Sequence, residues 1–174
     1  VMAGQGTIGC EILADLPDVE TVIVPLGGGG LISGVATAIK GLNPAVRVIG
    51  AEPALTPKYY QSRIAGRRVS LPLGNTIADG LRLSVPGRNP WPIIERHVDD
   101  IVLVEDADIV AGMHALARDA KLIAEPAAAI GIGALLAGAV RVRPGEKVCV
   151  LLTGGNWDLA DLASVYGRER AGAA

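Results

Sequence analysis

Short runs of branched apolar residues alternate along the chain with longer segments whose apolar residues recur every three or four positions. The short runs predict buried strands at 22–24, 46–51, 101–104 and 147–152. The longer segments predict helices at 8–13, 31–40, 57–65, 109–121, 127–140 and 159–166, with one or two helical turns at 92–97. This alternation predicts a single α/β domain over residues 1–174, an open, mostly parallel sheet with helices on both faces.

Three stretches carry little periodic signal. Residues 1–7 hold turn-forming residues and read like the interior of a protein, so we expect turns there and a chain that begins inside a longer protein. Residues 69–90 are rich in proline and glycine and predict a long functional loop. For the tail at 168–174 we expect fraying.

Four consecutive glycines, Gly27 to Gly30, join the first predicted strand directly to a helix. Because glycine loses much backbone entropy on folding, a surface turn seldom uses so many, although a flexible turn is the alternative interpretation. Such a run lets backbone N–H groups approach an anion in front of a helix N-terminus, which predicts a phosphate site. We therefore expect neither Gly28 nor Gly29 to tolerate a side chain, which would intrude on the phosphate or strain the backbone.

The known phosphate-binding patterns do not fit this run. The G-x-x-x-x-G-K-[ST] pattern is absent, and so is G-x-G-x-x-G. Glu52 nevertheless follows the second strand at about the distance of a ribose-binding carboxylate, which keeps an NAD-binding oxidoreductase domain as an alternative.

Composition and charge narrow the class of protein. Half of the residues are hydrophobic but there is no Phe, so the core consists of Val, Ile, Leu and Ala, as a buried parallel sheet requires. A net charge of −2 gives no reason to expect nucleic acid or an anionic membrane as partner. Cys10 and Cys149 form no C-x-x-C pair, and the most apolar segment, 127–140, is too short to span a bilayer. These features predict a cytoplasmic protein.

Chemistry-bearing residues gather where predicted strands end. The last strand leads into Thr153, whose hydroxyl could meet a neutral ring nitrogen. Glu125 precedes a helix, where the helix dipole favours an acid. His97 and His114 have no triad or metal-ligand neighbour, so we expect both at the surface.

Taken in order, these pieces resemble the serine racemase and threonine dehydratase family of fold-type II pyridoxal-phosphate (PLP) enzymes. The matching stretches cover nearly the whole chain and lie at 3–8, 24–30, 51–53, 60–62, 76–80, 89–94, 125–126 and 152–156. The resemblance implies dehydration of threonine or serine to a 2-oxo acid and ammonia, or racemisation of serine. It also implies PLP as cofactor, a small hydroxy amino acid as substrate, and a homodimer when the protein is full length.

The resemblance also implies roles for individual residues. Gly27, Gly28, Gly29, Gly30 and the Leu31 amide would hold the cofactor phosphate. Thr153 would face the pyridine nitrogen, and Glu125 would lie beside the ring. Positions that bind nucleotide in racemase-like members correspond to Lys121, Asn89 and Asn156.

Two departures from the family pattern stand out. The Schiff-base lysine and the substrate-carboxylate loop, which precede the glycine run in the family, are missing, so no catalytic residue is assigned here. The chain then resembles a C-terminal portion that holds most of the large cofactor domain and lacks the small domain. We expect it to be inactive alone; a non-catalytic PLP-binding or anion-binding regulatory domain is the alternative.

The second departure concerns a metal. Racemase-like members hold a divalent cation at positions that correspond to Glu52, Thr56 and Lys58, where an aspartate normally occupies the last position. Because an ammonium cannot ligate a cation, we expect no tight divalent metal site, and we expect Lys58 to neutralise Glu52.

Overall fold

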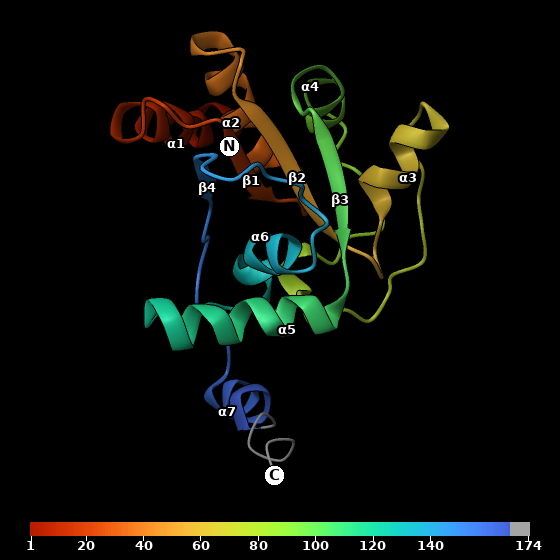
Figure 1. Ribbon diagram of the computed structural model, residues 1–174. Coiled ribbons are helices and arrows are strands. Elements are labelled where there is room, and N and C mark those ends of the chain that lie inside the picture. The colour runs from red at the N-terminus through yellow and green to blue at the C-terminus, as the bar shows by residue number, and fades with distance from the viewer. Residues whose placement is uncertain (168–174) are drawn as a thin grey trace.

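The computed structural model describes residues 1–167, in which four parallel strands form one open sheet (Figure 1). The order across the sheet is β3-β2-β1-β4, with bounds β1 Thr21–Pro25, β2 Arg47–Pro53, β3 Asp100–Val104 and β4 Val148–Val150. The α/β fold with an open parallel sheet is therefore confirmed. The prediction for the tail at 168–174 lies outside the described residues.

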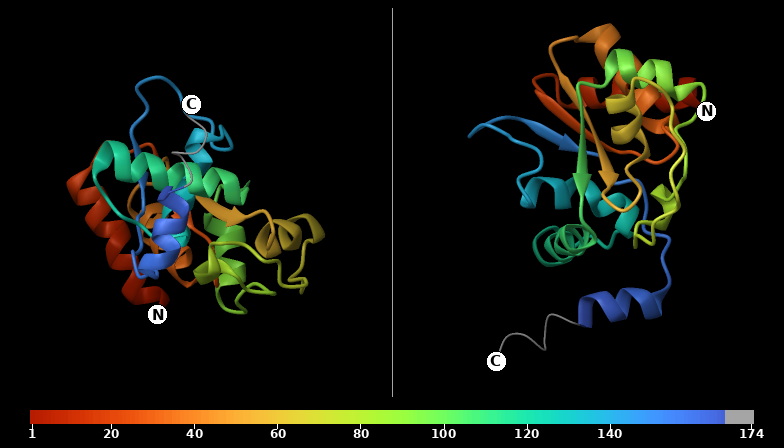
Figure 2. Two further views of the ribbon diagram at one scale, coloured as in Figure 1. Left: turned by 90° about the horizontal axis from the view of Figure 1, so that it is seen from below. Right: turned by 90° about the vertical axis from the view of Figure 1, so that its right-hand side faces the viewer.

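Helices cover both faces of this sheet (Figures 1 and 2). One face carries α1 (Met2–Asp15), α2 (Gly30–Leu42) and α4 (Pro90–His97). The other carries α6 (Pro126–Leu136), with α5 (Asp106–Ala115) packed against it and α7 (Leu159–Gly167) beyond. The short helix α3 (Lys58–Ala65) follows β2 at the end of the sheet where the strands finish. The connections also hold a 3₁₀ turn, η1 (Asp79–Leu81), and a π turn, η2 (Leu116–Ala120).

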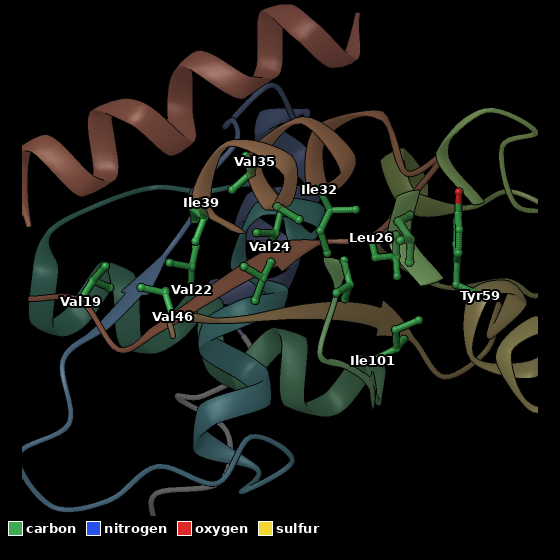
Figure 3. Packing of buried hydrophobic residues seen from close by; sticks show 14 residues of the cluster. Val19, Val22, Val24, Leu26, Ile32, Val35, Ile39, Val46, Tyr59 and Ile101 are labelled. Carbon is green, nitrogen blue, oxygen red and sulfur yellow. The ribbon is translucent and has the colours of Figure 1, made fainter. Parts of the chain in front are cut away.

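Two buried clusters lie on opposite faces of the sheet. Val22 and Val24 of β1 belong to the cluster under α2, shown in Figure 3, whereas Ile23 belongs to the cluster under α6. This alternation follows from the two-residue period of a strand. Because both faces are covered, every residue of β1 is buried. The branched apolar run that predicted this strand is what a doubly covered parallel sheet needs.

The first helix begins earlier than the sequence pattern predicts. The expectation of turns at residues 1–7 is wrong, because α1 starts at Met2. Its glycines serve contact with α2: a Cβ on Gly9 would lie 2.8 Å from Val35 O, and one on Gly34 would overlap the backbone of α1. Glycine at these positions lets α1 and α2 approach closely. The sequence pattern alone could not indicate this, because the two helices meet only in the folded protein.

The expectation that His114 lies at the surface is also wrong, since its side chain is buried. The ring stacks on Tyr166 of α7 with centroids 5.3 Å apart, and His114 Nε2 lies 3.2 Å from Val165 O. The last described helix therefore packs against His114, a contact that the local sequence does not indicate. In the part of the chain that the structure describes, no helix is long and apolar enough to cross a membrane.

Candidate functional site

The strand order creates a crevice between the carboxyl ends of β1 and β4. From β1 the chain proceeds through α2 to β2 on one side, while β4 pairs with β1 on the other side. Such a switch in strand order is where open α/β sheets bind ligands. The glycine run leaves β1 at this point, and the segment that carries Thr153 leaves β4 beside it.

Unpaired backbone amides line the glycine run. Among the described residues, the N–H groups of Gly27, Gly28 and Gly29 meet no acceptor. The run ends at Gly29, the residue before α2, with φ 88°. The amides of the first helical turn, 30–32, have no partner within the helix either. Together these groups form a row of hydrogen-bond donors at a helix N-terminus, an arrangement that is typical of anion sites in proteins.

The two central glycines differ in what a side chain would meet. A Cβ on Gly29 would lie 2.8 Å from Pro90 Cβ and would overlap the Tyr59 hydroxyl, and the positive φ disfavours any other residue. A Cβ on Gly28 would meet only Leu83 Cδ1 at 3.4 Å, and Gly28 is exposed. The expected backbone strain is confirmed for Gly29, which has a positive φ, and is not found at Gly28. Intrusion of a side chain on a bound phosphate stays a prediction for both glycines.

Leu31 and Thr153, predicted to touch the same ligand, line one cavity. Its volume is about 320 Å³, and its walls are formed by Gln5, Ile8, Leu31, Leu151, Leu152 and Thr153. The Thr153 side chain is exposed, and its hydroxyl meets no hydrogen-bond partner in residues 1–167. The cavity thus combines the start of α2 with a hydroxyl that is available to a ligand.

Glu125 lies against the same segment. Its backbone N–H donates to Gly154 O at 3.1 Å, and it is the residue before α6. A Cβ on Gly154 would be 3.2 Å from Glu125 Oε1, which places the carboxylate directly beside the residue after Thr153. The structure therefore brings Glu125 and Thr153 into one neighbourhood.

The three residues with predicted nucleotide roles are not joined to each other. Asn89 precedes α4, Lys121 follows η2, and Asn156 follows β4; all three are exposed. No hydrogen bond joins any two of them within the described residues, and their role remains a prediction.

Glu52 and Lys58 form a fully buried ion pair, which confirms the expectation that Lys58 neutralises Glu52. Lys58 Nζ lies 3.1 Å from Glu52 Oε1, and neither side chain is exposed. Burial raises the pKa of Glu52 and lowers the pKa of Lys58, while the attraction between the two charges opposes both shifts. No group of three or more His, Cys, Asp or Glu side chains that could hold a metal occurs in residues 1–167.

Each of the four lysines has a partner. Lys40 pairs with Asp99 at 2.7 Å, and Lys147 pairs with Asp18. Lys121 donates to Arg118 O at 2.5 Å, and Lys58 is held by Glu52. Within residues 1–167, none of these lysines lines the cavity beside Leu31 and Thr153.

Sequence reasoning missed Tyr59, which contacts the glycine run from α3. Its hydroxyl donates to Gly28 O at 2.8 Å and accepts from the Gly87 N–H at 3.0 Å. Burial raises the pKa of Tyr59 to about 12, so the hydroxyl keeps its proton at neutral pH. No local pattern could have indicated this residue, because the short helix that carries it is polar and its partners are distant in sequence.

The sequence matches a family model and curated relatives. Residues 1–154 match the model described as "Pyridoxal-phosphate dependent enzyme". The chain is 47% identical over 168 residues to an L-threonine ammonia-lyase of Geobacter sulfurreducens. This alignment covers 97% of the chain and 42% of that protein. The chain is 42% identical over 166 residues to a serine racemase of Arabidopsis thaliana, which covers 93% of this chain and 50% of that protein.

Solved structures agree with the sequence relatives. Maize serine racemase superimposes with a TM-score of 0.87 at 40% identity, over 98% of this chain and 53% of that one. The processed threonine deaminase isoform 2 of Solanum lycopersicum gives a TM-score of 0.90 at 32% identity, over 98% of this chain and 47% of that one. The chain thus spans about half the length of the relatives it matches.

Proposed function

Because the chain belongs to the family of pyridoxal-phosphate dependent enzymes, we propose that it is the phosphate-binding part of an enzyme that deaminates threonine or serine. The products are a 2-oxo acid and ammonia, and the substrate class is a small hydroxy amino acid. Relatives that are named as threonine ammonia-lyases and as serine racemases support this range of chemistry.

The observation that carries the proposal is the set of unpaired amides at the glycine run. A row of N–H groups without acceptors, in front of a helix N-terminus, fits the phosphate of PLP. Gly29 adds a backbone conformation that favours glycine at a point where a Cβ would collide with Tyr59. The chain therefore has donors for the phosphate, and position 29 accepts only glycine.

Thr153 favours elimination over racemisation. PLP, when bound, supplies an electron sink for the α-carbon of an amino acid. A hydroxyl such as that of Thr153 can hydrogen-bond a neutral pyridine nitrogen but cannot keep it protonated as a carboxylate partner would. A weaker sink favours prompt loss of the β-hydroxyl as water. Glu125, whose carboxylate is near Gly154, would lie beside the same ring.

We further propose that residues 1–174 form most of a cofactor domain whose reactive lysine lies in another segment. The four lysines present are engaged by Asp99, Glu52, Arg118 O and Asp18. The chain alone is therefore expected to bind PLP weakly and to release no 2-oxo acid from threonine or serine. The complete enzyme is proposed to be a homodimer.

Equilibrium dialysis of the 174-residue chain against PLP and against pyridoxal, which lacks the phosphate, tests the proposal. We expect PLP to bind at least about tenfold more tightly than pyridoxal, because the phosphate receives charge-assisted hydrogen bonds. Inorganic phosphate should compete with PLP. Equal affinities, or no competition, would contradict the phosphate assignment.

A second measurement tests whether the chain needs a lysine from another segment for catalysis. The chain is incubated with PLP, threonine or serine, and 2-oxo acid is measured, followed by borohydride treatment and peptide mapping. We expect no product and no cofactor attached to a lysine. Product release together with modification of a single lysine would show that the chain is catalytic by itself.

A further inference from the structure

We propose that Lys58 and Tyr59, the first two residues of α3, are positioning residues that fix the orientation of the glycine loop, residues 26–30. They hold two carbonyl groups of this loop on the α3 side, so that the neighbouring amides point to the opposite side. The inference rests on the proposed function, because it assigns those amides to a phosphate.

Lys58 holds the first carbonyl. Its Nζ, fully buried, lies 3.4 Å from Leu26 O and 3.2 Å from Leu81 O, in addition to its ion pair with Glu52. An ammonium has three protons to donate, and these three oxygens use all of them. Because the charge is balanced by Glu52 at 3.1 Å, the contribution of Lys58 to an anion site is the orientation of a peptide group, and the field of the pair is largely cancelled.

Tyr59 holds the second carbonyl. Its hydroxyl donates to Gly28 O at 2.8 Å, and its ring is fully buried in the cluster under α2, where Leu26 lies beside it (Figure 3). A raised pKa keeps this hydroxyl protonated, so it acts as donor to Gly28 O while it accepts from Gly87.

Peptide geometry converts these two contacts into a constraint on the amides. All peptide bonds described here are trans, and in a planar trans peptide the C=O and the following N–H point in opposite directions. Fixing Leu26 O toward Lys58 therefore directs the Gly27 N–H away from α3. Fixing Gly28 O toward Tyr59 directs the Gly29 N–H away in the same manner. Both amides are among those that meet no acceptor.

Glu52 makes α3 a rigid support for these side chains. Its two carboxylate oxygens accept the backbone N–H groups of Tyr59 and Tyr60, each at 2.9 Å. The end of β2 is thus bonded directly to the first turn of α3, and Lys58 completes the same buried group. Because β2 pairs with β1, this bonding fixes the position of α3 relative to the glycine loop.

Lys58 and Tyr59 also hold the segment 81–87, which packs against the glycine loop. Lys58 bonds Leu81 O and Tyr59 bonds the Gly87 N–H, so they fix both ends of the segment 81–87. This segment lies against the glycine loop, since a Cβ on Gly27 would meet Leu81 and one on Gly28 would meet Leu83. The loop is consequently held between α3 and 81–87 in one orientation.

Amide shifts on titration with inorganic phosphate test the inference, with Tyr59→Phe compared against Tyr60→Phe. Tyr60 is the neighbouring residue of α3, and its hydroxyl makes no hydrogen bond within residues 1–167, so it is a matched control. In the unchanged chain we expect phosphate to shift the Gly27 and Gly29 amides. Tyr59→Phe should weaken phosphate binding by about tenfold, since Gly28 O and Gly87 N–H lose their partner. Tyr60→Phe should bind as the unchanged chain does.

A double variant tests Lys58 without leaving a lone buried charge. Lys58→Met combined with Glu52→Gln removes both charges and keeps similar side-chain volumes, and the Gln oxygen still accepts one of the two N–H groups that Glu52 binds in α3. We expect a folded protein, judged by its circular dichroism and dispersed amide spectrum, with phosphate binding again weakened about tenfold.

The outcomes separate this inference from the proposed function. No phosphate effect on the unchanged chain would contradict the proposed function, and the inference with it. Normal binding by the unchanged chain, by Tyr59→Phe and by the double variant would overturn only the inference. Loss of the folded spectrum in Tyr59→Phe would also count against it, because Tyr59 would then be a residue of general stability.

Discussion

The two ends of the parallel sheet contain different kinds of polar chemistry. At the amino ends of the strands lies a cavity of about 600 Å³, lined by charged residues that include Arg47, Arg143 and Glu146. Most of these charged groups form hydrogen bonds or ion pairs with one another. The buried Thr21 hydroxyl donates to Glu146 at 2.6 Å, Arg47 bonds Glu146 at 2.9 Å, and Arg143 bonds Glu20 at 2.6 Å.

At the carboxyl ends of the strands the cavity is smaller, and fewer of the polar groups have hydrogen-bond partners. The cavity beside Leu31 and Thr153 has about 320 Å³, roughly half the volume of the other. Yet this end has backbone amides without acceptors and the Thr153 hydroxyl without a partner, as far as residues 1–167 show. The comparison teaches that a row of N–H donors in front of a helix N-terminus, and not cavity volume, favours an anionic ligand, because the helix dipole adds to the free donors there.

The largest expected effect is at the carboxyl end, in Gly29→Ala. A positive φ costs a residue other than glycine about 1 to 2 kcal/mol, and the new Cβ would overlap the Tyr59 hydroxyl. The loop must move, so we expect affinity for PLP to fall by about tenfold or more. Gly41→Ala, in the last turn of α2 and outside the glycine run, is the control, because nothing lies near its Cβ. It should lose less than about threefold, and equal losses in both variants would contradict the assigned geometry.

The next effect belongs to the amino end and concerns stability. Glu146→Gln weakens the contacts with Thr21, Arg47 and the Arg143 N–H. We expect the melting temperature to fall by a few degrees while affinity for PLP stays unchanged. A loss of PLP affinity in this variant would show that the two ends do not act separately.

The stabilising effect of Glu146 should depend on pH in one direction. The Thr21 hydroxyl, and then the Arg143 N–H and Arg47, lower the pKa of Glu146 from 4.5 to about 2. A carboxyl group whose folded pKa is depressed stabilises the fold above its unfolded pKa and loses this contribution as pH falls through the folded value. In urea unfolding, the unchanged chain should exceed Glu146→Gln in stability near neutral pH. The difference should shrink between pH 4.5 and about 2, and a difference that grows on acidification would have the wrong sign.

The smallest effect is expected at Thr153→Ala. The hydroxyl is exposed, so one hydrogen bond to the pyridine nitrogen should contribute about threefold to PLP affinity. Inorganic phosphate, which has no ring, should bind the variant and the unchanged chain equally. A loss of phosphate binding would place Thr153 in the phosphate site instead.

Local patterns sufficed for the parts of the molecule that depend on neighbours in sequence. The buried strands, the glycine run behind β1 and the order of elements follow from periodicity and from glycine chemistry. The Glu52–Lys58 pair was also predictable, because the two residues follow the same strand within a few positions.

The features that were missed depend on contacts between distant segments. Asp106, in the first turn of α5, accepts from the Thr76 hydroxyl at 2.5 Å and from the Ile77 N–H at 3.0 Å. His114 is covered by α7, and Tyr59 reaches Gly28 across about thirty residues of sequence. No spacing rule connects such partners, since only the packed sheet brings them together.

The most direct test is a titration of the chain with PLP, followed by amide chemical shifts along the backbone. We predict that the amides of residues 27–31 move first and most, with Thr153 among the affected residues, while Arg47 and Glu146 at the opposite end stay unchanged. The largest shifts at the amino-end cavity, with the glycine loop unmoved, would contradict the central claim that the unpaired amides are the phosphate site.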